Sequence, residues 1–197
     1  LTFGCIQLTD ERLPVLEMAV ERGVNLVHIC SSYVNGQAIQ SLAKFLKKPG
    51  VRDKVWIMIK GIHPTVDEEL KTLNTDHADF YCAPLNKPDQ IKNEKELAKF
   101  EAIKKAGKVR FFNLTTHQSM QESMEAALDT GWYSTLLPAI DLSIVEQCKP
   151  TLQRAVKMNV GVMAMKSMRN KKAGGGPDKL AAALFPAGVT TILKTLN

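Results

Sequence analysis

Short apolar runs recur along this chain at nearly regular intervals, and each is followed by a segment with helical periodicity. In these segments apolar residues stand three or four positions apart, which indicates amphipathic helices. The runs we expect to form strands are Phe3–Gln7, Leu26–Cys30, Val55–Lys60, Asp79–Ala83, Val109–Thr115, a stretch within Tyr133–Leu142, Gly161–Met165 and Val189–Leu193. Nearly continuous apolar strands that alternate with helices predict a parallel sheet with its faces covered.

Eight strands is the number that closes a (β/α)8 TIM barrel. The strand–helix units are compact, at about 25 residues each, against the ~250 residues typical of the whole fold. A doubly wound open sheet is the alternative, but it predicts a glycine fingerprint after the first strand, where this chain has only Gly4. We therefore expect an α/β chain that forms a compact TIM barrel, with residues 1–197 as a single domain. The chain begins with Leu1 rather than methionine, so we expect a processed protein or a trimmed part of a longer one.

Local signals also predict where helices begin. Asn93 opens a helix that ends near Gly107. Ser119 and Glu122 have the spacing of a capping box, in which each side chain binds an unpaired backbone amide at the start of a helix. Pro150 is expected at the start of another helix, because the first turn does not need its missing N–H.

The four cysteines are far apart in the sequence, which favours buried thiols over a disulfide framework or a closely spaced metal site. They are Cys5, Cys30, Cys82 and Cys148. The histidines likewise lack metal-ligand spacing, so we expect no metal. Free thiols predict a reducing intracellular compartment, either the cytoplasm or an organelle matrix.

The net charge is +6 at pH 7, and the lysine pairs of the chain stand at expected helix ends or in loops. No aromatic residues interleave with these lysines, so nucleic-acid binding is not expected. No stretch approaches the ~20 apolar residues of a membrane-spanning helix, and the amino end lacks the pattern of a signal peptide.

In a barrel, functional residues lie at the carboxyl ends of the strands. Tyr33 stands in a polar turn after the second expected strand, and Lys60 ends the third. Tyrosine has a reference pKa of ~10, and a nearby cation lowers that pKa and makes the phenol a better proton donor. The two residues therefore have the chemistry of an acid pair. The alternatives are that the Tyr33 ring only packs, that Lys60 only reaches solvent, and that His28 is an ordinary core histidine.

Several stretches resemble, in order, the motifs of the aldo-keto reductases. They are GVNLVHICSSYVNG, MIKGIHPT, HADFYCAPLNK, GKVRFFNLTTHQ, GVMAMK and the closing TTILKT. The resemblance spans nearly the whole chain and implies a TIM barrel that lacks the amino-terminal hairpin and the terminal helices of the family. It also implies NAD(P)H-dependent reduction of a small-molecule carbonyl.

The catalytic tetrad of that family is aspartate, tyrosine, lysine and histidine, and it falls here on His28, Tyr33, Lys60 and Pro84. Two of the four are replaced, and Ala139 stands where the family stacks an aromatic residue on the nicotinamide. The resemblance thus implies Tyr33 and Lys60 as catalytic residues. It implies NADPH as the cofactor, held by Thr115, Thr116, Lys194 and Thr195.

Two functions follow from this pattern. The first is an NAD(P)H-dependent carbonyl oxidoreductase. The second is a catalytically inactive barrel that serves as a binding or structural subunit, with protein partners in a larger assembly. A protonated His28 would repel Lys60, and Pro84 has no side-chain donor to polarise a carbonyl, so we expect the acid function to be weakened.

Overall fold

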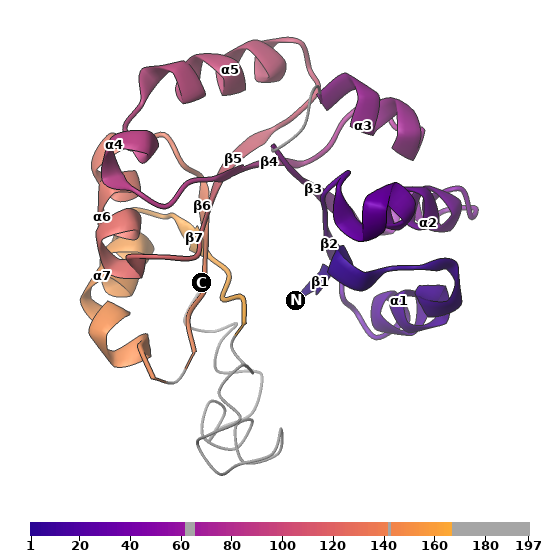
Figure 1. The fold of residues 1–197 in the computed structure, drawn as a ribbon, viewed down its shortest axis with the longest axis horizontal. Coiled ribbons are helices and arrows are strands. Elements are labelled where there is room, and N and C mark those ends of the chain that lie inside the picture. The colour runs from indigo at the N-terminus through magenta and orange to yellow at the C-terminus, as the bar shows by residue number, and fades with distance from the viewer. Residues whose placement is uncertain (62–65, 142, 167–197) are drawn as a thin grey trace. The chain divides into compact units, whose positions relative to one another are not determined.

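The computed structural model describes residues 1–61, 66–141 and 143–166. Its strands are β1 (Thr2–Gly4), β2 (Leu26–Ile29), β3 (Trp56–Lys60), β4 (Phe80–Pro84), β5 (Phe111–Thr116), β6 (Thr135–Pro138) and β7 (Gly161–Val162). Its α-helices are α1 (Leu13–Glu21), α2 (Gln37–Leu46), α3 (Val66–Leu73), α4 (Pro88–Ile91), α5 (Glu94–Lys105), α6 (Met120–Thr130) and α7 (Val145–Lys157). Strands and helices alternate along the chain, as Figure 1 shows by its colour sequence. None of the helices in these described ranges has the length and apolar character needed to cross a membrane.

The chain forms two compact units. The first contains Leu1–Leu85 and Asn93–Thr115, and the second contains Asn86–Lys92 and the chain from Thr116 onward. In the first unit, β1 to β5 pair in sequential order, and every pairing is parallel. Sequential parallel pairing with a connection after each strand is the arrangement that the alternating sequence pattern predicts.

One face of the sheet in the first unit is apolar and packs on helices. Phe100 of α5 stacks on Phe112 of β5, with ring centroids 4.5 Å apart, so this face of the sheet lies against α5. Alternate strand residues share this face, because successive side chains point to opposite sides. Its fully buried members include Val27, Ile29, Ile57, Ile59, Phe112 and Leu114.

The opposite face of the same sheet is mixed in character. It carries Met58, Lys60, Cys82 and Asn113 at successive positions of the strand register. Of these, Lys60 is half-buried and the others are buried. Polar side chains therefore collect on one side of the sheet, towards the carboxyl ends of its strands.

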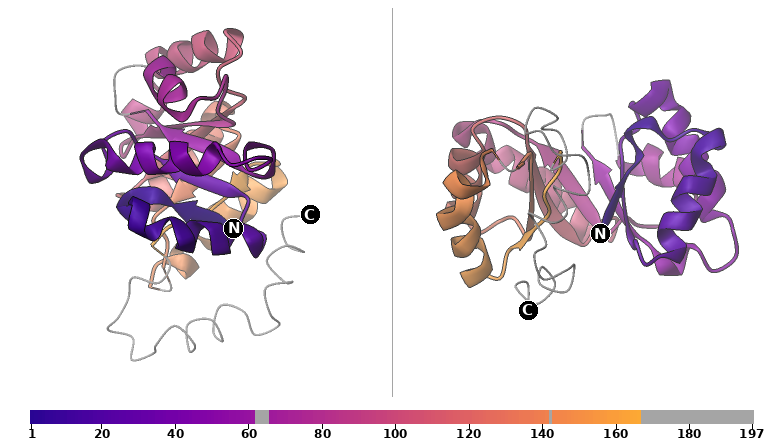
Figure 2. Two further views of the ribbon diagram at one scale, coloured as in Figure 1. Left: turned by 90° about the vertical axis from the view of Figure 1, so that its right-hand side faces the viewer. Right: turned by 90° about the horizontal axis from the view of Figure 1, so that it is seen from below.

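The second unit pairs β6 with β7 in parallel, with Thr135 opposite Gly161. Helices α6 and α7 pack against each other, and Figure 2 shows them in orange tones beside the strands of this unit. The buried side chains Met124 and Leu128 of α6 contribute to its core. The Tyr133 hydroxyl donates a hydrogen bond to the carbonyl of Ile91, 2.9 Å away, which ties α4 into this unit.

The strand prediction is confirmed for seven of the eight runs. The eighth run, Val189–Leu193, lies outside the described residues, so closure of an eight-stranded barrel stays a prediction. The single domain over residues 1–197 also stays a prediction.

Three local predictions are wrong. Only the residues up to Gly4 form β1, and Cys5–Gln7 forms a short 3₁₀ helix instead of continuing the strand. Pro150 lies inside α7 rather than at its start, because the helix already begins at Val145. Ser119 does precede α6, but its φ of 44° is left-handed and its hydroxyl makes no capping hydrogen bond.

Candidate active site

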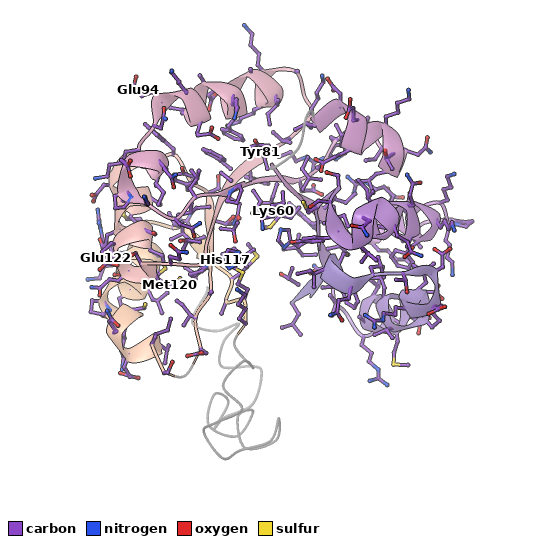
Figure 3. All side chains as sticks on the ribbon, viewed as in Figure 1. Lys60, Tyr81, Glu94, His117, Met120 and Glu122 are labelled. Carbon is purple, nitrogen blue, oxygen red and sulfur yellow. The ribbon has the colours of Figure 1, made fainter. Side chains whose placement is uncertain are left out.

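The carboxyl ends of β3, β4 and β5 are brought level by the register of the sheet. Lys60 at the end of β3 lies opposite Cys82 of β4, and Cys82 lies opposite Asn113 of β5. One step further along, Pro84 lies opposite Thr115. Figure 3 labels Lys60 at this end of β3 and Tyr81 on the neighbouring strand, on the opposite face of the sheet.

Tyr33 lies in the turn that follows β2. Its backbone N–H donates to the carbonyl of Cys30, 3.1 Å away, which closes the turn. Its ring meets the ring of His28 edge-on, with centroids 6.4 Å apart. The phenol is half-buried, and it shares the first unit with Lys60 and Thr115.

Burial dominates the acidity of Tyr33. Desolvation raises the pKa of its phenol to about 12, and the neighbouring thiols of Cys30, Cys82 and Cys5 act in the same direction. The sequence had led us to expect a lowered pKa from the cation of Lys60. The expected direction is wrong for the structure as it stands, because removal from water disfavours the phenolate and no cation is among the influences on this pKa.

Cys82 is the neighbour that the predicted site residues share. Its side chain is fully buried, and its Sγ donates to Oδ1 of Asn113 at 2.9 Å. Burial raises the pKa of the Cys82 thiol, while the positive charge of Lys60 and a hydrogen bond with Thr115 oppose that rise. Because the same thiol also influences Tyr33, Tyr33, Lys60 and Thr115 are gathered around one buried sulfur.

The two replaced tetrad positions lie at the same ends of the strands. His28 is half-buried on β2, opposite Met58, and lies on the same face of the sheet as Lys60. Pro84 ends β4 and offers only its ring and its carbonyl. Neither side chain supplies a carboxylate to Lys60. Pro84 also has no hydrogen-bond donor for a substrate oxygen.

Thr116 belongs to the second unit, where its surroundings are polar. The Thr116 hydroxyl donates to the carbonyl of Gln118 at 3.0 Å and lies 3.4 Å from Oδ1 of Asn86. The same Asn86 oxygen accepts the backbone N–H of His117 at 2.7 Å. Ala139 donates its N–H to the carbonyl of Thr116, 3.1 Å away, so these two predicted positions are adjacent.

His117 also contacts a lysine from the end of the described chain. Its Nδ1 lies 3.0 Å from Nζ of Lys166, and Figure 3 shows His117 beside α6. An ammonium group has only donors, so Nδ1 of His117 is the acceptor in this contact.

Lys194 and Thr195 lie outside the described residues, so the structure does not place these two predicted cofactor contacts. Within residues 1–61, 66–141 and 143–166, three or more His, Cys, Asp or Glu side chains nowhere gather in a way that could hold a metal ion.

The sequence reasoning missed several residues of the site. Cys82 and Asn113 lie on the same face as Lys60, and the period-two alternation of a strand was the signal that could have found them. Asn86 gave only the weak signal of a polar residue just after an apolar strand.

Solved structures that resemble this chain are aldo-keto reductases. A putative aldo-keto reductase from Pseudomonas aeruginosa matches with a TM-score of 0.76 at 18% identity, over 93% of this chain and 77% of its own. An aldo-keto reductase from Klebsiella pneumoniae in complex with NADPH matches with a TM-score of 0.69 at 18% identity, over 97% of this chain and 74% of its own. The holo form of an aldo-keto reductase from Bacillus halodurans matches with a TM-score of 0.68 at 20% identity, over 83% of this chain and 60% of its own. Identities this low establish a common fold alone.

No curated protein matches the sequence. The sequence profile of the Aldo/keto reductase family, however, matches residues 1–175. This match covers most of the chain and includes every motif on which the resemblance rests except the closing TTILKT. The chain therefore belongs to the aldo/keto reductase family.

Proposed function

We propose that this protein reduces small-molecule carbonyl compounds with NADPH, on a scaffold that is most of a (β/α)8 barrel. Tyr33 is the proton donor, and Lys60, at the end of β3 in the same unit, is the cation assigned to assist it. The observation that carries the proposal is the grouping of Tyr33, Lys60 and Thr115 around Cys82 at the carboxyl ends of neighbouring parallel strands. Active sites of β/α barrels occupy this end of the strands.

The chemistry assigned to these residues is the delivery of one proton. When NADPH is bound it supplies the hydride, and the alkoxide that results needs a proton on its oxygen. With a pKa of about 12, the Tyr33 phenol is fully protonated at neutral pH. An alkoxide is a stronger base than a phenolate, so the transfer is downhill. Lys60 then stabilises the phenolate that is left.

The residues at the strand ends fit the nicotinamide end of NADPH by donor and acceptor type. The Thr116 hydroxyl donates its hydrogen within the protein, but its oxygen keeps acceptor capacity for the amide of a carboxamide. Thr115 at the end of β5 has the same chemistry. We assign Lys194 and Thr195 to the phosphate end, where an ammonium group acts as a point charge. The complex of the Klebsiella pneumoniae aldo-keto reductase with NADPH supports NADPH as the cofactor, by analogy of fold.

A second candidate function is a catalytically inactive barrel that acts as a binding or structural subunit in a larger assembly. The raised pKa of Tyr33 favours it, because a phenol whose pKa lies far above neutral pH is a sluggish proton donor. His28 and Pro84 at the replaced tetrad positions point the same way. The two candidates differ in whether NADPH binds.

Titration with NADPH separates the two candidates. A ligand that binds only the folded protein stabilises it by RT ln(1 + [L]/Kd), or about 2.7 kcal/mol at 100 times Kd. We expect the melting temperature to rise and the fluorescence of NADPH to change. If neither changes up to high micromolar NADPH, the reductase proposal is wrong and the subunit proposal gains support.

Substitution of Tyr33 tests its catalytic role. We expect Tyr33→Phe to lower the rate of carbonyl reduction by about 10²-fold or more, because the transition state loses its proton donor. NADPH affinity should stay within about twofold. Tyr81→Phe is the matched control, because it removes a hydroxyl from another buried tyrosine of the same unit, on the opposite face of the sheet. Equal losses in both variants would contradict the assignment.

A further inference from the structure

Glu69 is a buried carboxylate on the face of α3 that packs into the first unit. Its side chain is only 3% exposed, and it lies among Val66, Leu70 and Leu73, which are buried as well. Its neighbour Glu68 is exposed. Burying a carboxylate among apolar groups is costly unless hydrogen bonds compensate for the lost water. The carboxylate oxygens of Glu69 therefore need hydrogen-bond donors inside the protein.

Glu69 binds the turn that carries Tyr33. Its Oε1 accepts a hydrogen bond from the backbone N–H of Ser31, 3.3 Å away. Ser31 lies two residues before Tyr33, inside the turn that the Tyr33 N–H closes on the Cys30 carbonyl. A helix distant in sequence thus holds the segment that places the phenol.

The turn needs such an anchor because its own backbone preferences work against it. Val34 and Asn35 have φ angles of 52° and 53°, and Gly36 has a φ of 89°. A left-handed conformation costs roughly 1–2 kcal/mol for a residue with a Cβ, and it is especially unusual for a β-branched one. Contacts from outside the turn must therefore hold it in place, and the hydrogen bond to Glu69 is one of them.

The charge of the same carboxylate acts on Tyr81, which packs beside the residue that follows Lys60. Burial raises the pKa of Tyr81 to about 12, and the charges of Glu96 and then Glu69 add to the rise. The Tyr81 hydroxyl fills the space beside Gly61, the residue after Lys60, since a Cβ built on Gly61 would lie 2.2 Å from that oxygen. Glu69 therefore binds the turn that carries Tyr33, and its charge acts on the tyrosine that packs beside Gly61.

We propose that Glu69 is a positioning residue for Tyr33, which fixes the Ser31–Gly36 turn through its hydrogen bond to Ser31. Its charge is not among the influences on the pKa of Tyr33, so it acts through the backbone and not on the proton. The catalytic part of this role rests on the proposed reductase function. The structural part does not, and the two are measured separately.

The structural part is tested on the phenol itself. The chain has three tyrosines, so NMR of ring-labelled tyrosine resolves each one during an alkaline titration, and Tyr33→Phe assigns the signal. In Glu69→Leu we expect the midpoint of Tyr33 to move from about 12 towards the ordinary value of 10.0, because a released turn exposes the ring. Glu69→Gln keeps an acceptor oxygen for Ser31 and should keep the wild-type midpoint. Glu68→Gln on the exposed side of α3 is the surface control.

The catalytic part is tested by steady-state kinetics with the same variants. We expect Glu69→Leu to lower kcat by about 10- to 100-fold, since small displacements of a reacting group cost that much, with NADPH affinity unchanged. Glu69→Gln should restore most of the rate. If Glu69→Leu folds poorly, Glu69→Met offers a flexible apolar replacement of similar length.

The outcomes separate this proposal from the reductase function. An unchanged Tyr33 midpoint in both Glu69→Leu and Glu69→Met would overturn the positioning role, whatever the activity. If the wild-type protein neither binds NADPH nor reduces carbonyls, the reductase function fails, while the Tyr33 midpoint still decides the positioning role. Equal losses of kcat in the leucine and glutamine variants would also count against the hydrogen bond, since glutamine preserves it.

Discussion

Gly61 shows at the scale of one residue how tightly the end of β3 is packed. A Cβ at this position would lie 2.2 Å from the hydroxyl oxygen of Tyr81 and 2.3 Å from the ring carbon that bears it. The Tyr81 ring stacks on Phe112, whose ring stacks on Phe100. Because Tyr81 is backed by this aromatic series, it has little freedom to move away from a new methyl group.

Gly61→Ala is therefore expected to lower the free energy of unfolding by about 1–3 kcal/mol, the usual cost of overpacking a core. Tyr81→Leu shortens the side chain that would clash, so the alanine should cost much less in that background. Urea unfolding of the four proteins of this double-mutant cycle measures the coupling. Gly4→Ala is the control, since nothing lies within 4 Å of its added Cβ. Additive effects of the two substitutions would contradict the predicted clash.

The proposed site residues differ in how far the sequence foretold them. The positions of Tyr33 and Lys60 in the candidate site were predictable from the ends of apolar runs, because active sites of β/α barrels lie at the carboxyl ends of the strands. The pKa of Tyr33 did not follow, since it depends on burial that only the folded chain creates. Glu69 could not be predicted at all, because its partner is a backbone N–H remote in sequence.

At the scale of elements, Asp79 links three strands of the first unit at their amino ends. Its Oδ2 accepts the backbone N–H of Ile57 on β3 at 2.8 Å. Its Oδ1 lies 3.3 Å from the guanidinium of Arg110, just before β5, and Arg52 lies 3.7 Å from Oδ2. The carboxylate is almost fully buried, so this group of interactions replaces the water that it lost on folding.

Asp79→Ala is expected to destabilise the protein by about 1–3 kcal/mol, the cost of leaving the buried N–H of Ile57 without its acceptor. Asp79→Asn keeps an acceptor for the Ile57 amide and should cost less. Both are measured by urea unfolding, against Asp53→Ala at an exposed position as the control. A cost for Asp79→Ala within about 0.5 kcal/mol of that control, the range of ordinary surface substitutions, would show that Asp79 does not link the strands.

Element boundaries show where sequence signals compete. The predicted start of α5 at Asn93 is confirmed, since the Asn93 side chain accepts the N–H of Lys95. Pro150 indicated a helix start, yet α7 begins at Val145 and continues through the proline. Packing of Cys148 and Thr151, which are buried on either side of it, outweighs the one backbone hydrogen bond that proline removes.

For the whole molecule, the alternation of apolar runs and amphipathic segments was enough to predict an α/β chain with sequential parallel strands. That pattern is set by the burial of strand and helix faces, which is a property of the sequence itself. The division into two compact units was not predictable, because it depends on which contacts form between remote segments. The mixed face of the sheet was predictable in principle, because the two-residue alternation of strand side chains places Lys60, Cys82 and Asn113 on one side.

The stability of the whole protein at alkaline pH follows from two buried phenols. The pKa values of Tyr33 and Tyr81 are raised from 10.0 to about 12 in the folded protein, chiefly by burial. A raised pKa means that the folded state holds its proton where the unfolded state has released it. The resulting stability is fully present below pH 10 and is lost as the pH rises through about 12.

We therefore expect the free energy of unfolding, measured in urea at a series of pH values, to fall above pH 10. Tyr33→Phe and Tyr81→Phe should each make this fall shallower, because phenylalanine has no proton to lose. The double variant should show the shallowest fall. Lysines titrate in the same range, so the difference in slope between each variant and the wild-type protein is the quantity that reports on the phenols. If the double variant loses stability as steeply as the wild type, burial of these two hydroxyls does not govern the alkaline limit of the fold.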